Sequence, residues 1–240
     1  MAKRNYKGTP GLAVRELLAS DDGTSDLYAG TASVYVKCGD PVEHPAPLHE
    51  YLASRLAHSL GIPVPFGELA AIRGSDRAWA SAVVGASGKG APPGDVAKAA
   101  AAEPHVFAGI CVFDVWIHNV DRWEENIIWS PEMGLWAIDH ERAFGEFNPR
   151  TEESLQEHFD AVSVPFQRES VLPRSEFADR WASLIRQHGP YWAKVATEAA
   201  HRRKLANRPV LKQYEEFLSY RASTIFSLTS KAFGFSPGLF

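Results

Sequence analysis

Apolar and polar residues in the first third of the chain follow the spacing of a few strands around one helix. Residues 27–37 are rich in β-forming side chains and predict a strand. Residues 48–60 carry Leu and Tyr at helical spacing and end at Gly61, which fits the glycine position that follows a helix. Residues 66–72 and 77–84 predict two further strands. This part of the chain therefore reads as a small β-rich unit that contains one helix.

After a segment rich in Gly and Pro, the pattern becomes mostly helical. The residues from 85 to 94 contain most of these breakers and predict a boundary between two parts of the chain. Beyond it, helical spacing predicts two helices before the middle of the chain and three amphipathic helices after it, at residues 96–103, 104–118, 174–188, 190–205 and 209–226. The fold class predicted is α+β, with a β-rich first part and a larger, mostly α-helical second part.

Two short apolar runs near the middle of the chain predict a β-hairpin with polar residues at its ends. The runs lie at 127–129 and 135–138, on either side of a Pro- and Gly-containing turn. Asp121 and Asn126 precede the first run, and Asp139 ends the second. We therefore expect these three side chains at one end of a small sheet.

An Asp, Asn and Asp set in this arrangement suits phosphoryl transfer from ATP. One carboxylate can orient or deprotonate the attacking hydroxyl, while an amide oxygen and a second carboxylate hold magnesium against the phosphates. Asp and Asn are also common in ordinary turns, so the spacing alone is a weak signal. Their position at the ends of buried elements favours the catalytic interpretation.

At these residues the chain resembles a known family. Asp121-Arg122, then Asn126, and beyond it Ile138-Asp139 are similar to the catalytic and metal-binding loops of HipA-like kinases, which share the pattern with the protein-kinase and phosphoinositide-kinase fold. The D-R-x-x-x-N form is closer to phosphoinositide kinases than to the H-R-D of ordinary protein kinases. His140 follows Asp139, where a D-F-G motif has Phe.

The resemblance implies a two-lobed protein-kinase-like fold, in a short form that contains only the kinase core. The expected N-lobe is residues 1–85, the linker is 86–95, and the helical C-lobe is 96–240 with a catalytic hairpin at about 121–139. Larger HipA proteins have an extra N-terminal subdomain that this chain is expected to lack.

The resemblance also implies a role for each site residue. Asp121 would be the catalytic base or hydroxyl-orienting group, and Asn126 and Asp139 would bind Mg²⁺. Lys37 would contact the ATP phosphates, and Glu50 would hold Lys37 in place. Each of the last two also has an ordinary reading, Lys37 as a surface lysine at a strand end and Glu50 as a favourable charge at a helix N-terminus.

The ATP-covering features are less distinct in the sequence. The strand end at 81–84, which includes Val83, is the expected hinge whose backbone could hydrogen-bond the adenine edge. The polar, turn-rich segment at residues 20–26 contains Gly23, and Gly30 follows it, but there is no G-x-G-x-x-G, so as a phosphate-binding motif it is weak.

Taken with the family, these residues predict an ATP- and Mg²⁺-dependent Ser/Thr protein kinase, of a kind that sometimes acts as a toxin held by a DNA-binding antitoxin. A small-molecule or lipid kinase of the same fold remains an alternative. So does a pseudokinase that binds nucleotide as an interaction module, although no chemical position carries an inert residue. A metal hydrolase is disfavoured, because the nine histidines form no H-E-x-x-H or similar spacing.

Composition limits the remaining classes. The chain has 240 residues, a net charge of −4 and two cysteines, so it has neither an overall basic field for nucleic acid nor a disulfide framework. Its basic start lacks the apolar core of a signal peptide, and the apolar run 106–117 is interrupted by Asp114 and too short to span a bilayer. We expect a cytoplasmic protein with no direct contact to nucleic acid or membrane.

Overall fold

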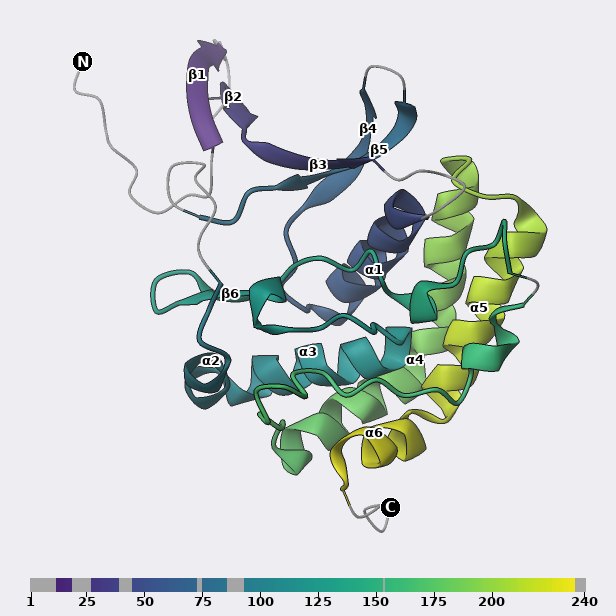
Figure 1. Ribbon diagram of the computed structural model, residues 1–240. Helices are drawn as coiled ribbons and strands as arrows, with labels where there is room; N and C mark the ends of the chain where they lie inside the picture. Colours follow the sequence, from purple (N-terminus) through teal and green to yellow (C-terminus); the bar gives the residue numbers. More distant parts are fainter. Residues whose placement is uncertain are drawn as a thin grey trace.

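The computed structural model describes residues 12–18, 27–38, 45–72, 75–85, 93–152 and 154–235. The architecture is mixed α/β, with small antiparallel sheets at one end of the molecule and a mostly helical remainder (Figure 1). The predicted α+β composition is therefore confirmed. The turn at 20–26 and most of the expected linker, residues 86–92, lie outside the described residues.

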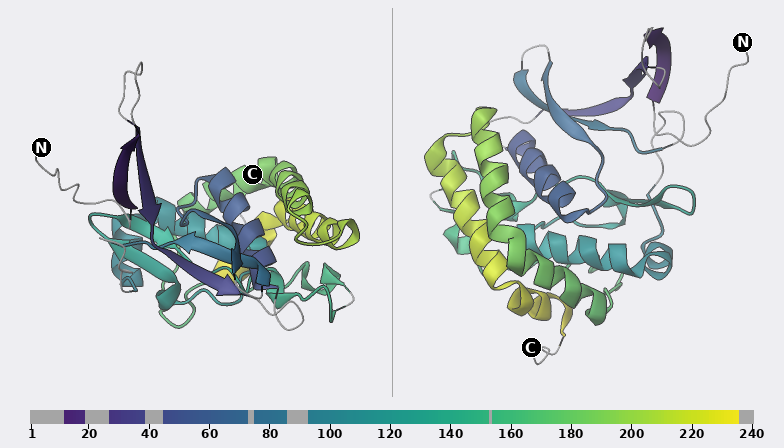
Figure 2. Two further views of the ribbon diagram at one scale, coloured as in Figure 1. Left: turned by 90° about the horizontal axis from the view of Figure 1, so that it is seen from above. Right: turned by 180° about the vertical axis from the view of Figure 1, so that it is seen from behind.

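The first part of the chain forms two antiparallel sheets. Strands β3 (Val34–Cys38), β5 (Ser75–Ala82) and β4 (Gly67–Ile72) pair in that order in a three-stranded sheet. Strands β1 (Leu12–Leu18) and β2 (Leu27–Ala32) form a separate two-stranded sheet that projects from the body of the molecule (Figure 2). The strand predicted at 27–37 is thus two strands, because the chain leaves one sheet and enters the other.

Register in the three-stranded sheet brings Lys37 opposite Trp79 on the central strand. The Trp79 ring also lies against Gly67 of the other neighbouring strand, where an added Cβ would be 2.1 Å from Trp79 Cζ2. Only glycine fits that position without moving the ring, so the sheet can pack a large aromatic side chain close to its own backbone.

Helix α1 (Ala46–Leu60) packs under this sheet, as Figure 1 shows. Pro47 fits its first turn, where a missing N–H costs no helical hydrogen bond. Gly61 ends it with φ 75°, a left-handed conformation that glycine adopts without a steric cost. Most of the helix is buried, including Glu50 at 5% exposure. A carboxylate so deep in the protein requires a partner.

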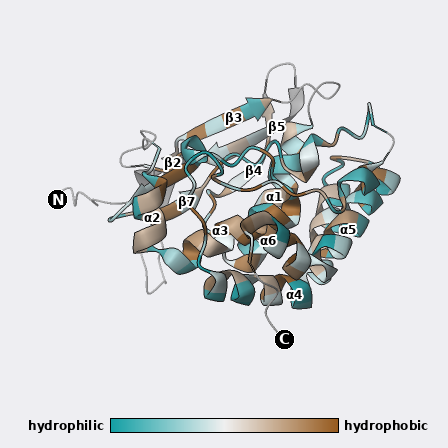
Figure 3. Ribbon diagram, turned by 60° about the horizontal axis from the view of Figure 1, so that its bottom comes forward, coloured by the Kyte–Doolittle hydropathy of each residue, from teal (hydrophilic) through white to brown (hydrophobic). Residues whose placement is uncertain are grey.

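The centre of the helical part is α3 (Pro104–Ile117), which follows the short helix α2 (Val96–Ala102). Every residue of α3 from Phe107 onwards is buried, and most of these residues are hydrophobic (Figure 3 colours the chain by hydropathy). Among the described residues, no single helix is long and apolar enough to cross a membrane. The pair α2 and α3 meets that criterion only together and is bent by 119° between them.

The predicted hairpin is present as β6 (Ile127–Ser130) and β7 (Gly134–Ala137), which pair antiparallel. Gly134 takes a left-handed φ of 73° at the turn. The Ala137 N–H donates to the Pro63 carbonyl oxygen at 2.9 Å, so the hairpin is tied to the chain that leaves α1.

The prediction of separate helices at 174–188 and 190–205 is wrong. Helix α4 (Ser175–Arg202) runs without a break for 28 residues and contains Pro190. A proline inside a helix removes one hydrogen bond and costs about 3 kcal/mol, but α4 packs along its length on α3, α1 and α5 (Arg208–Ser223). This packing outweighs the local penalty. The last predicted helix is also divided, because α6 (Ile225–Phe233) starts just after α5.

Candidate active site

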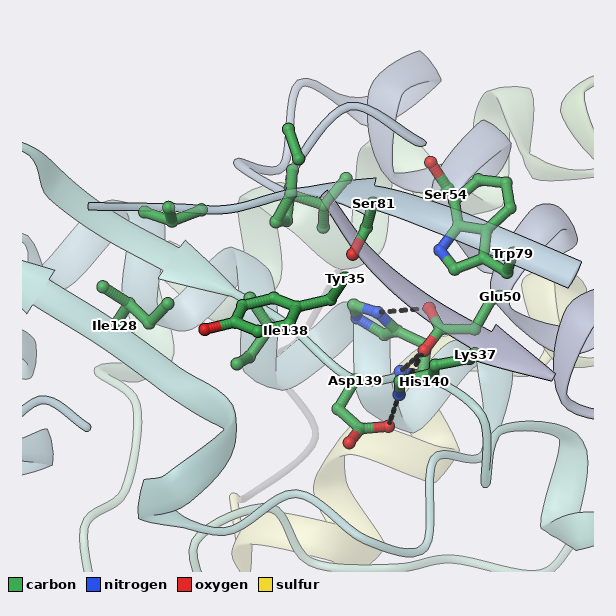
Figure 4. Close-up of a pocket in the computed structure, with 14 residues that line it drawn as sticks. Tyr35, Lys37, Glu50, Ser54, Trp79, Ser81, Ile128, Ile138, Asp139 and His140 are labelled. Carbon is green, nitrogen blue, oxygen red and sulfur yellow. Dashed lines mark hydrogen bonds and ion pairs between the residues drawn. The ribbon is translucent and has the colours of Figure 1, made fainter. Parts of the chain in front are cut away.

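The Lys37 ammonium group is the centre of a cluster of three carboxylates from distant parts of the chain. Its Nζ lies 2.8 Å from Glu50 Oε1, 2.5 Å from Asp139 Oδ1 and 3.1 Å from Glu141 Oε2. Figure 4 shows Lys37 from β3 and Glu50 from α1 converging on Asp139, which follows β7. The structure therefore brings together Lys37, Glu50 and Asp139, three of the predicted site residues.

The charged side chains of this cluster strongly affect one another's pKa. Burial acts to lower the pKa of Lys37, but the charges of Glu50 and Asp139 and their hydrogen bonds outweigh it, and the pKa is raised above its ordinary value. Burial raises the pKa of Glu50, against the opposing effect of the Lys37 ammonium. The His140 N–H supports Glu50 by donating to its Oε1 at 3.2 Å. Lys37 is thus a fixed positive charge at neutral pH.

A pocket opens beside this cluster, between the three-stranded sheet and the hairpin (Figure 4). One end is polar, with Lys37, Glu50 and Asp139. The rest of the lining is largely apolar and comes from the sheet, the segment after α1, and the hairpin, with Trp79, Val64, Val84, Ile128 and Ile138. An apolar slot that ends in a fixed ammonium group is suited to a flat ring joined to an anionic group.

Val83, expected in the hinge, lies directly after the end of β5. Val83 is buried and is not among the residues that line the pocket, whereas Ala82 and Val84 are. Its N–H donates to the Ser33 carbonyl oxygen at 3.0 Å. The expected backbone contact of this segment with an adenine edge stays a prediction, with the Val83 N–H already bonded to Ser33.

Asp121 lies after the end of α3, in a loop that starts with His118 in a left-handed conformation (φ 49°). The Trp123 indole N–H donates to Asp121 Oδ1 at 2.7 Å, and Arg142 Nη1 lies 3.4 Å from the same oxygen. The carboxylate is partly exposed and does not line the pocket with Lys37. It is therefore oriented by its neighbours and partly open to solvent.

Asn126 and Asp139 sit on adjacent ends of the hairpin strands. The Ile138 N–H donates to the Asn126 carbonyl oxygen at 3.1 Å, which places Asp139 next to that strand end. The Asn126 amide donates from Nδ2 to the Asp121 carbonyl oxygen at 2.6 Å. Within the described parts of the chain, no donor bonds to Asn126 Oδ1. Carboxylate and amide oxygens are the ligands that Mg²⁺ prefers, so these two residues fit that ion.

Asp114 and Arg122 are central to the site, although the sequence assigned neither of them a role. Arg122 donates from Nε to Asp114 Oδ2 at 2.7 Å, and from Nη1 to the carbonyl oxygens of Asn126 at 2.8 Å and Ile138 at 2.6 Å. Both charged side chains are fully buried. The signal in the sequence was Asp114 itself, because an acid within an apolar helix must have a partner.

His140 and Glu141 are the other residues of the site that sequence reasoning missed. His140 Nε2 lies 2.8 Å from Arg122 Nη2, which donates to it. Burial, with the positive charges of Arg122 and Lys37, holds the pKa of His140 well below its ordinary value, so the ring is neutral. Glu141 is the third carboxylate on Lys37. No local pattern marks either residue, since their partners lie up to about a hundred positions away in the chain.

These features can be compared with known proteins. The model of the family described as HipA-like kinase matches residues 29–216. A solved structure described as the Shewanella oneidensis MR-1 toxin antitoxin system HipA, HipB and its operator DNA complex contains a chain with a similar fold. The TM-score is 0.51 and the identity 13%, over 98% of this chain and 70% of that one. No curated protein matches. Because the family match covers most of its length, this chain belongs to the HipA-like kinase family.

Proposed function

We propose that this protein is an ATP- and Mg²⁺-dependent kinase that phosphorylates Ser or Thr hydroxyls of a protein substrate. The observation that carries the proposal is the Lys37 cluster, in which residues from β3, α1 and the end of β7 meet within 2.5 to 3.1 Å of one ammonium group. A structural surface lysine has no need of several carboxylates beside an apolar pocket. A lysine that receives phosphates must be held at a fixed point.

The proposed architecture is two-lobed, with an N-lobe at 1–85, a linker at 86–95 and a C-lobe at 96–240. The adenine ring would occupy the apolar part of the pocket, beside Val84 and Ile138. The phosphates would extend towards Lys37, and Glu50 would keep the lysine from turning away when they arrive. Since Glu50 is buried and bonded from two sides, it is well placed to do so.

For transfer, Asp121 would accept a hydrogen bond from the acceptor hydroxyl and take its proton. The hydroxyl oxygen forms a new bond to the γ-phosphorus, and the bond from that phosphorus to the bridging oxygen breaks, so that ADP leaves. Magnesium, when bound, would neutralise charge on the phosphates, and Asn126 and Asp139 are the residues that would hold it. Asp139 would then exchange part of its bond with Lys37 for the metal.

A partner protein of the antitoxin type is part of the proposal. The similar structure from Shewanella oneidensis contains HipA with HipB and operator DNA. The net charge of −4 gives this chain no overall attraction to DNA, so a DNA contact would be made through the partner.

The test of the function begins with nucleotide binding. ATP with Mg²⁺ should raise the melting temperature of the protein more than ATP with EDTA, because bound ligand stabilises the native state. Asp139→Asn should remove most of the Mg²⁺-dependent part, whereas Asp179→Asn on α4 serves as a matched control. Equal shifts with and without Mg²⁺ would count against the metal site.

The acceptor can then be found by incubating the protein with labelled ATP and Mg²⁺, with and without cell lysate, followed by mass spectrometry. Labelled Ser or Thr in a lysate protein supports the proposed substrate class. Label in lipid or a small metabolite would instead support another acceptor on the same fold. Nucleotide binding with no transfer to any fraction would identify a pseudokinase.

A further inference from the structure

The loop that carries Asp121 supplies no usable cation to the acceptor side of the site. Between Asp121 and Asn126 its charged residues are Arg122, Glu124 and Glu125. The Arg122 guanidinium is fully buried and bonded to Asp114 and to backbone carbonyl oxygens. It cannot reach a group bound in front of Asp121, and the two glutamates would repel a phosphate.

Lys37, like the proposed Mg²⁺, serves the nucleotide side of the site, because its ammonium group is held by Glu50, Asp139 and Glu141 rather than by Asp121. Arg168 is near the loop, but its guanidinium stacks over the Trp123 ring, 4.0 Å from the ring centre. The transfer of a phosphoryl group develops charge on its oxygens, and that charge requires a nearby donor.

Arg142 is the cation that contacts the Asp121 carboxylate within the described part of the chain. Its Nη1 lies 3.4 Å from Asp121 Oδ1, and its Nε contacts Glu146 Oε1. The backbone at this point is anchored, since the Arg142 carbonyl oxygen accepts from the Val120 N–H at 3.3 Å. The side chain is 46% exposed. Because the Arg142 backbone is held in place and the outer end of its side chain is exposed, the guanidinium can turn towards a group bound at Asp121.

The geometry points to Arg142 as a further catalytic residue, one that donates to the oxygens of the phosphoryl group during transfer. This inference rests on the proposed kinase function. As the acceptor oxygen bonds to the γ-phosphorus and ADP leaves, the guanidinium holds two of the oxygens that gain charge, and Asp121 takes the hydroxyl proton. A planar fork of N–H groups matches phosphoryl oxygens better than a single ammonium group does.

Loss of such a donor lowers kcat by about 10²–10³-fold, with less effect on nucleotide binding. Arg142→Gln should therefore have a much lower kcat and a nearly unchanged KM for ATP, measured as ADP release with Mg²⁺. Arg142→Lys should recover only a part, because it keeps the charge and loses the fork. Arg150→Gln, an exposed arginine in the same segment, is the control and should match the wild type.

A binding measurement separates this role from that of the nucleotide site. The melting temperature is recorded with MgADP alone and with MgADP plus aluminium fluoride, which imitates the phosphoryl group in transfer. For the wild type and Arg150→Gln, fluoride should add a further upward shift. For Arg142→Gln the MgADP shift should remain and the added shift should be lost.

The outcomes test the kinase function and the role of Arg142 separately. If MgADP stabilises neither the wild type nor the variant, the proposed kinase function fails. If MgADP binds and the two proteins respond equally to fluoride, or if Arg142→Gln keeps the wild-type kcat, the role of Arg142 is refuted while the kinase proposal stands.

Discussion

Replacement of Arg122 by Met tests the idea that one buried arginine organises the catalytic loop and both strand ends. The Met side chain has a similar length but no charge and no donors. The variant loses the bonds to Asp114, to the carbonyl oxygens of Asn126 and Ile138, and to His140. Water cannot replace these lost hydrogen bonds, because the Arg122 side chain is completely buried.

The expected loss of stability follows from the buried Asp114 carboxylate, which remains in the Arg122→Met variant. Asp114 would keep one donor, the Asn119 amide at 3.0 Å, while its charge stays buried. Breaking a buried ion pair by removing one partner costs about 3–5 kcal/mol. In a chain of this size, 1 kcal/mol corresponds to a shift of about 2–4 °C in melting temperature, so we expect a decrease of about 6–20 °C. Adding Asp114→Asn should recover part of the loss, since it removes the stranded charge.

The assay is urea unfolding followed by circular dichroism, with the free energy of unfolding taken by linear extrapolation. Arg202→Met, an exposed change at the end of α4, is the matched control and should cost no more than about 1 kcal/mol. A loss for Arg122→Met no larger than that of the control would refute the reasoning. The reasoning would also be refuted if Asp114→Asn, added to Arg122→Met, lowered the free energy of unfolding further instead of recovering part of it.

Three further predictions concern the site and the pH dependence. Lys37→Met should weaken MgATP binding and activity, and it should also lower the free energy of unfolding, because the buried Glu50 carboxylate loses its ammonium partner. Glu50→Gln should weaken nucleotide binding more mildly, as titration with nucleotide would show; normal binding by Lys37→Met would remove it from the site. Asp121→Asn should lower phosphotransfer by about two orders of magnitude or more and leave nucleotide binding intact; unchanged turnover would make Asp121 an ordinary turn residue. Burial, with Arg221 and His158 nearby, lowers the pKa of His118 from 6.5 to about 3, so the unfolded state binds one proton more between these values and stability falls by about 1.4 kcal/mol for each pH unit as pH decreases. His118→Asn, which tolerates the left-handed backbone, should remove that slope in urea unfolding at a series of pH values, and an unchanged slope would contradict the assignment.

The catalytic hairpin and its flanking residues could be predicted because their signals are local. Asp121, Asn126 and Asp139 lie within 19 positions of one another, and the apolar strands between them have a simple period. The loop polarity and the strand ends therefore fixed their approximate place without any knowledge of the rest of the fold. The contact between Lys37 and Glu50 was predicted through the family resemblance, which implies that a strand lysine pairs with an acidic residue of the following helix.

Other features depended on contacts that no local pattern records. Pro190 predicted a helix start, but packing of α4 against several helices overrode the lost hydrogen bond. The bond from the Val83 N–H to the Ser33 carbonyl oxygen joins two segments about fifty positions apart, so no local pattern could predict it.

Thus the sequence alone determined the fold class, the family resemblance and the residues that carry the proposed chemistry, because side-chain type and short-range spacing encode them. Only the tertiary structure decided how Arg122, Glu141 and Arg142 take part. The partners of these side chains lie on other elements of the fold: a strand, a helix and a loop. The distances between the paired charged groups are set by the packing of the whole core rather than by residues next to them in the sequence.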